Sequence, residues 1–198
     1  MKARVFLSLL LVGAMLFFQA CSDDDVPPIE NIEEEITQVI LTFTNVQDAS
    51  DVVTAEWLDA DGEGGNPPVI DDVVLTANVN YELSVTFFNT LENPAVNISD
   101  EVEEEAEEHM IFFAFADPLF QDPSGTGNVD SRSGVVNYND TDSNGLPLGL
   151  STDWVTSETP ANGSFRLVLK HQPGIKSESS TVADGESDAD VSFDVSVE

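Results

Sequence analysis

Apolar and polar residues alternate with a period of two through much of this chain. From Tyr81 to Phe87 every second side chain is apolar, and the same pattern recurs over residues 164–170 and 191–197. Such alternation indicates strands with one buried and one solvated face, which is typical of antiparallel sheets. Weaker patterns predict further strands over residues 37–44, 52–58, 69–76, 111–116, 134–138 and 153–157.

Stretches rich in Gly, Asn, Asp and Pro separate these predicted strands. Examples are the run from Gly62 to Pro68, the pair Asn144-Gly145 and the pair Asp184-Gly185. These residues favour tight turns, and eight or nine short strands with turns at this spacing are typical of a sandwich. We therefore predict an all-β fold over residues 37–198, an antiparallel immunoglobulin-like sandwich.

One segment breaks the strand pattern, because residues 99–110 are rich in helix formers. Ser99 and Asp100 are candidate N-caps, and Val102, Ala106 and Met110 fall on one helical face. This stripe predicts one short acidic helix that packs against an end of the sandwich.

The first 20 residues have the layout of a secretory signal peptide. Lys2 and Arg4 precede an apolar run over residues 5–18, which is too short to span a bilayer. Ala20 and the only cysteine, Cys21, follow, and this ending resembles the lipobox of bacterial lipoproteins. The resemblance implies that Cys21 carries the lipid anchor and becomes the mature N-terminus. The alternative is ordinary secretion with a spare cysteine.

Residues 21–36 are predicted to form an acidic tether behind the lipidated cysteine. The runs Asp23–Asp25 and Glu33–Glu35 repel themselves and offer little to bury. An acidic run in this place resembles the export tag of surface-exposed lipoproteins in Bacteroidota. The alternative is a solvated spacer that faces the periplasm.

The chain is strongly acidic, with 38 Asp and Glu against six Lys and Arg. Such a charge repels nucleic acid and anionic membrane surfaces, and it attracts cations or basic partners. It is also common as a surface property of exported or salt-adapted proteins. Once Cys21 is lipidated, no cysteine remains for a disulfide or a thiolate metal site.

The two histidines suggest a transition-metal site. Glu105 and His109 are four residues apart in the predicted helix, a spacing that lets two side chains bind one cation. His171 continues the inward positions of the strand over residues 164–170. If the histidines meet, Glu105, His109 and His171 form a reasonable site for Zn²⁺ or Cu²⁺. The alternative is a solvated helix and a histidine at the edge of the core.

Two loops carry oxygen ligands at alternate positions before a glycine, as a calcium loop begins. The candidate calcium ligands are Asp59, Asp61, Glu63, Asp140, Asp142 and Asn144. Neither loop has the glutamate or the flanking helices of an EF-hand. The alternative is a pair of β-turns.

No catalytic motif is present, so the sequence favours a non-enzymatic protein. The signal, the tether and the strand pattern together resemble small outer-membrane lipoproteins of Bacteroidota with one β-sandwich, facing the periplasm or the cell surface. That resemblance implies ligand capture or an accessory role in nutrient or metal uptake, with a TonB-dependent receptor or another envelope protein as partner. A structural or adhesive module stiffened by calcium is the alternative, and a secreted hydrolase is the third.

Overall fold

The structure is a computed structural model that describes residues 34–198. The predicted signal peptide, the lipidation of Cys21 and most of the acidic tether therefore lie outside the described residues. Within the described part, no helix has both the length and the apolar character needed to cross a membrane.

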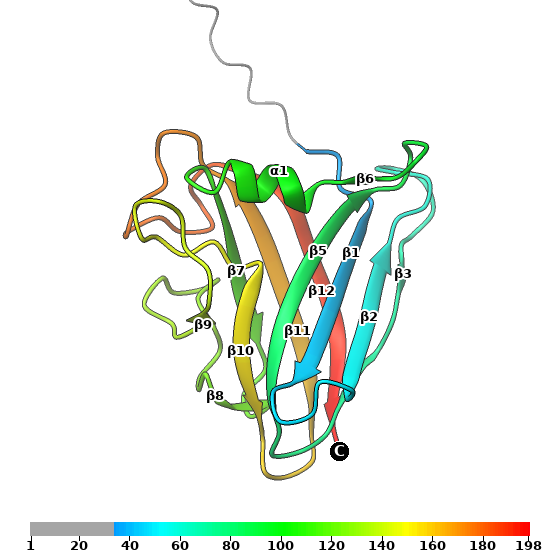
Figure 1. Cartoon of the computed structure of the whole chain (residues 1–198), viewed down its shortest axis with the longest axis vertical. Coiled ribbons are helices and arrows are strands. Elements are labelled where there is room, and N and C mark those ends of the chain that lie inside the picture. The colour runs from blue at the N-terminus through cyan, green and yellow to red at the C-terminus, as the bar shows by residue number, and fades with distance from the viewer. Residues whose placement is uncertain (1–33) are drawn as a thin grey trace, which may run out of the picture. The chain divides into compact units, whose positions relative to one another are not determined.

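Two packed β-sheets make up the described domain (Figure 1). The first has the strand order β3-β2-β1-β5-β10-β8, with β6 beside β5 and β9 beside β10, and the second has the order β4-β12-β11-β7. The strands are β1 (Gln38–Asn45), β2 (Val52–Leu58), β3 (Val69–Ile70), β4 (Val73–Leu75), β5 (Asn80–Asn89), β6 (Val96–Asn97), β7 (His109–Phe115), β8 (Phe120–Asp122), β9 (Asn137–Tyr138), β10 (Ser151–Thr156), β11 (Ala161–His171) and β12 (Glu186–Val197).

The core lies between the inner faces of the two sheets. Along β5 the apolar residues from Tyr81 to Phe87 are buried, while Glu82 and Ser84 between them are exposed. Trp154 on β10 is fully buried, and its ring centroid lies 4.8–5.6 Å from those of four phenylalanines: Phe113, Phe115, Phe120 and Phe165. Burial of these aromatic surfaces supplies much of the driving force for packing the sheets together.

The prediction of an all-β sandwich is confirmed, whereas an immunoglobulin-like topology is not. One pairing also departs from the antiparallel expectation, since β4 runs parallel to β12 and joins Val73 to Val195. The predicted strand over 69–76 is divided between the two sheets as β3 and β4.

The acidic helix is shorter than the predicted segment 99–110. Helix α1 spans Ser99–Glu104, and residues 105–108 form a turn that leads into β7 at His109. Val102 is fully buried and anchors α1, but Met110 belongs to a strand and packs beside Phe112 and Val168. The prediction was wrong here because pairing with β11 extends β7 back to His109 and overrides local helix propensity.

Candidate metal centre

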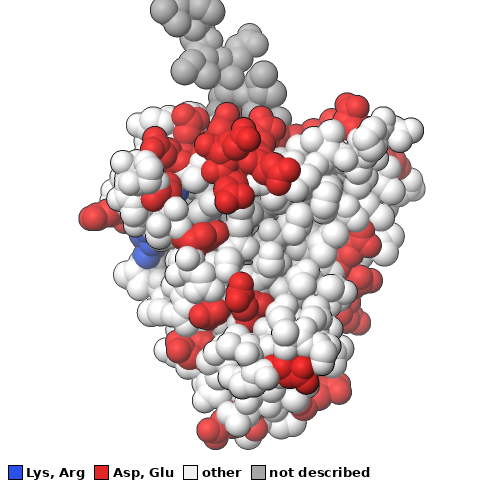
Figure 2. Space-filling model, viewed as in Figure 1, with Lys and Arg blue, Asp and Glu red and all other residues white. Residues whose placement is uncertain are grey.

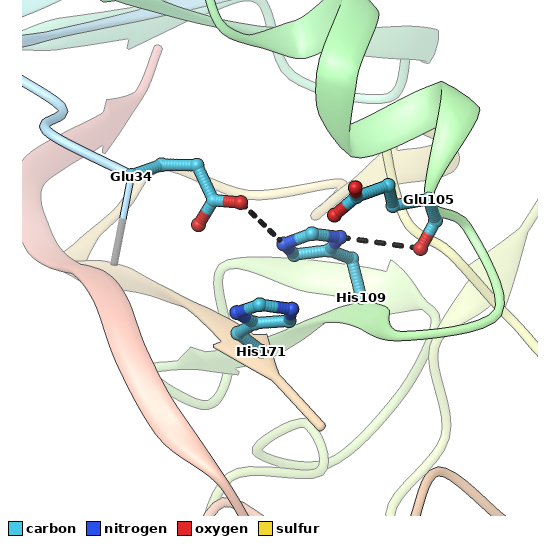
Figure 3. Close-up of side chains that lie close together, drawn as sticks. All are labelled: Glu34, Glu105, His109 and His171. Atoms are coloured by element: carbon cyan, nitrogen blue, oxygen red, sulfur yellow. Dashed lines mark hydrogen bonds and ion pairs between the residues drawn. The ribbon is translucent and has the colours of Figure 1, made fainter. Parts of the chain in front are cut away.

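The two histidines of the chain are cross-strand neighbours. His109 begins β7 and His171 ends β11, and the antiparallel register places them opposite each other. Their rings stack with centroids 4.5 Å apart and planes inclined by 8° (Figure 3). Both residues are buried. The sheet register therefore produces a paired imidazole site at one end of the sandwich.

The main chain orients the ring of His109. Its Nδ1 lies 3.2 Å from the carbonyl oxygen of Glu105, in the turn after α1 (Figure 3). Because a carbonyl oxygen accepts, Nδ1 carries the proton of this hydrogen bond, and Nε2 is left to face the opposite side. In metal-bound histidines, a hydrogen bond from the nitrogen that does not bind the metal commonly fixes the orientation and tautomer of the ring.

Two carboxylates face Nε2 of His109. Glu34 Oε1 lies 3.2 Å away and Asp188 Oδ2 lies 3.7 Å away, and the side chains of both acids are at least nine-tenths buried. A lone pair on Nε2 pointing at two carboxylates is unfavourable, so a proton or a metal ion belongs between them. Burial alone lowers the pKa of His109, but Glu34, the Glu105 carbonyl and Asp188 outweigh that effect and raise the pKa above its usual 6.5.

His171 has its own carboxylate partner. Its Nε2 lies 3.3 Å from Glu108 Oε2, on the turn that leads into β7. The Glu108 side chain is 42% exposed, in contrast to the carboxylates beside His109. The Nδ1 atom of His171 is buried and has no hydrogen-bond partner within residues 34–198. The two imidazoles thus share a stack but face different acids.

One ligand atom from each of Glu34, Glu105, His109 and His171 falls within a group no wider than 4.8 Å. Two ligands of a tetrahedral zinc ion at their usual bond lengths are about 3.3 Å apart. The 3.2 Å between His109 Nε2 and Glu34 Oε1 already matches this separation between ligands. The exposed Glu105 side chain has room to move in, so a cation fits with small side-chain adjustments. No other such group forms among the histidines and acids of residues 34–198.

The structure thus brings together Glu105, His109 and His171, as the sequence predicted, but by a different route. Glu105 and His109 do not share a helix, because α1 ends before both of them. Sequence reasoning missed Glu34, which it placed in the solvated tether. The β-sandwich domain extends to residues before 37, since Ile36 packs on the core.

Asp188 was also missed, and a β-bulge explains why. On β12, Ala189 pairs with Leu169 while Ser187 pairs with Lys170, so Asp188 is the extra residue at the register shift. By strict alternation Asp188 would share the exposed face of Asp190 and Asp194. A bulge re-aims one side chain, and here it brings the carboxylate to His109.

Three of the candidate calcium ligands already accept hydrogen bonds from the main chain. Asp61 accepts hydrogen bonds from the main chain and the side chain of Asn66, and Asp140 accepts from the main chain of Gly149 and Ser151. Asp142 caps the main chain of Asn144 and Leu146. The local contacts of Asp61 and Asp142 agree with the turn alternative, whereas Asp140 joins more distant parts of the chain. Among the histidines and acids of residues 34–198, the one gathered group includes none of Asp59, Asp61, Glu63, Asp140 and Asp142.

Acidic side chains gather over α1 and the turn that follows it (Figure 2). Between this turn and the loop after β9 lies an open groove, lined by Glu103, Glu105, Glu107, Glu108 and Asp140 among others. Two of these residues, Glu105 and Glu108, also contact the histidine pair. The groove therefore places a strongly negative surface beside the candidate metal centre.

Comparison of the chain with models of protein families, with curated proteins and with solved structures finds no match. Function is therefore inferred from the geometry of the site and from the sequence.

Proposed function

We propose that this protein is an exported, membrane-anchored lipoprotein that binds a divalent transition metal through Glu34, Glu105, His109 and His171. One observation carries the proposal: the only two histidines of the chain are buried, stacked and flanked by carboxylates. Burial of several carboxylates in one place is costly unless a cation accompanies them.

The ligand chemistry narrows the choice of metal. Imidazole nitrogen with carboxylate oxygen suits Zn²⁺, Cu²⁺ and neighbouring divalent ions, whereas no thiolate lies within the gathered group. The hydrogen bond from Nδ1 of His109 to the Glu105 carbonyl leaves Nε2 to bind the metal, which supports this use of His109. Zn²⁺ and Cu²⁺ are therefore the first ions to test.

The acidic groove supports a role in capture. A cleft of one charge sign raises the local concentration of the opposite ion and the rate at which it arrives. We propose that the protein is non-enzymatic and gathers its metal at the outer membrane for an uptake system. A TonB-dependent receptor or another envelope protein is the proposed partner, and this part rests on the resemblance of the leader and tether alone.

Calorimetry tests metal binding directly. Zn²⁺ and Cu²⁺ are titrated at neutral pH into the purified protein and into the variants His109→Ala, His171→Ala and the double variant. We expect saturable, stoichiometric binding that each single variant weakens. The double variant should bind no metal here, because it removes every nitrogen ligand of the group.

Glu103→Gln is the control, since Glu103 is an exposed acid of α1 outside the ligand group. It should bind like the wild type. Absence of saturable binding in the wild type, or single histidine variants that bind equally well, would overturn the proposal.

A further inference from the structure

We infer that the centre holds two metal ions, one on each histidine, with Glu105 between them. This inference deepens the proposed function and rests on it. It starts from the observation that His109 and His171 each have a separate carboxylate neighbour.

The first half-site is formed by His109, Glu34 and Asp188. Nε2 of His109 lies 3.2 Å from Glu34 Oε1 and 3.7 Å from Asp188 Oδ2. The side-chain exposures are 0% for His109, 6% for Glu34 and 0% for Asp188, so this position is closed to solvent. One nitrogen and two carboxylates face the same point. The two negative charges of the carboxylates would balance the charge of a divalent ion bound there.

The second half-site is formed by His171 and Glu108. Their Nε2 and Oε2 atoms lie 3.3 Å apart, close to the edge of a metal coordination polyhedron. Glu108 is partly exposed and lines the acidic groove, so this ion keeps a route to solvent and room for water ligands. The second ion should therefore bind more weakly and exchange faster than the first.

Glu105 is placed to bridge the two positions. Its carboxylate belongs to the group that includes Glu34, His109 and His171, and it lies near the histidine stack (Figure 3). The stacked rings, with centroids 4.5 Å apart, bring the two half-sites next to each other, and the ions of two-metal sites lie about 3.5–4 Å apart. A bridging carboxylate is the usual way to hold two cations this close.

The ligand inventory agrees with two ions. Glu34, Glu105, Glu108 and Asp188 supply four negative charges, which two divalent cations balance when both histidines are neutral. Two histidines with four carboxylates is also the ligand set of carboxylate-bridged di-iron and di-manganese sites. This oxygen-rich set extends the candidate ions beyond Zn²⁺ to Mn²⁺ and Fe²⁺.

Metal counting with Mn²⁺ and Zn²⁺ tests the inference. The metal-stripped protein is dialysed against each ion at physiological salt, and bound metal per chain is measured by elemental analysis. Electron paramagnetic resonance of the Mn²⁺ form then reports distance, since two Mn²⁺ ions on one bridge give an exchange-coupled spectrum. We expect two ions per chain and a coupled spectrum in the wild type.

Glu108→Gln should retain one ion and lose the coupling, because it removes a ligand only from the outer half-site. The control Glu104→Gln, an exposed acid on α1, should keep both ions and the coupling. One ion per chain at saturation would overturn the two-ion inference and leave the proposed function intact. Two uncoupled ions would also overturn it, by placing the second ion elsewhere, and no bound ion would overturn both proposals.

Discussion

Lys176 Nζ lies 3.0 Å from Asp142 Oδ2, and both side chains are almost completely buried. The same ammonium donates a 2.7 Å hydrogen bond to the carbonyl of Ala106, in the turn after α1. Lys176 thus ties the loop of Asp142 to the turn that carries Glu105. The chain has few basic residues, and this one stabilises the wall of the acidic groove.

Replacing Lys176 with Met should destabilise the fold strongly. Removing one partner of a buried ion pair leaves an uncompensated charge, and such changes cost about 3–5 kcal/mol. Urea unfolding of wild type and variant measures the difference. Arg166→Met is the control, since Arg166 pairs with Asp190 at the surface with side chains 40% and 47% exposed. Exposed pairs contribute about 0–1 kcal/mol to the free energy of unfolding. Equal losses of stability in the two variants would show that the Lys176–Asp142 pair is not a stabilising buried ion pair.

Calcium should stabilise the protein no more than sodium does at equal ionic strength. The sequence offers two loops as candidate calcium sites, but Asp61, Asp140 and Asp142 already accept main-chain hydrogen bonds, and Lys176 occupies the cation position beside Asp142. Thermal melts in matched calcium and sodium buffers decide the question. A specific rise in melting temperature with calcium would restore the two loops as ligand sets.

The metal-free protein should lose stability as pH rises through the pKa of His109. Glu34 and Asp188 raise this pKa above 6.5, so the charged imidazole stabilises the fold fully below pH 6.5, and that stability fades above the folded-state pKa. Zinc must displace the same proton, so zinc affinity should rise with pH until His109 is neutral. Nuclear magnetic resonance of the histidine ring protons, recorded as a function of pH, measures the pKa of His109 in the folded protein.

Glu34→Gln should lower the pKa of His109, and Glu103→Gln, an exposed acid outside the ligand group, should not. An unchanged His109 titration in Glu34→Gln would mean that Glu34 does not face the ring in solution.

Cys21→Ser should release the protein from the membrane fraction, because lipidation needs the thiol that follows Ala20. Fractionation after a salt wash, followed by immunoblotting, measures the distribution. A variant that still sediments with membranes would show that the anchor is not at Cys21.

Alternation predicted most of the fold because long strands such as β5 and β12 have one solvated face. The predicted segment 52–58 is β2, and the strong pattern around Tyr81 is β5. The short strands β6 and β8 were missed, since two or three residues carry no period and exist only through their partners. The prediction of helix at residues 109 and 110 was wrong because these residues pair with β11, and this pairing, rather than local propensity, determines their conformation.

The metal centre was partly predictable because histidine is rare in this chain. Two such residues beside predicted strands were enough to suggest a pair, but their contact comes from the register of β7 and β11, which no local spacing reveals. Glu34 looks like its neighbours Glu33 and Glu35 in sequence. Asp188 needs the bulge in β12, and a one-residue shift leaves no signature in an acidic segment.

The bulge and the histidine pair also have a consequence for folding. Glu34 precedes β1, His109 opens β7, His171 closes β11, and Asp188 lies on β12. Contacts between residues so distant in the chain form late, because loop closure must precede them. The site is complete only when β11 has paired with strands on both sides, so metal binding would select the fully folded molecule and reject partly folded chains.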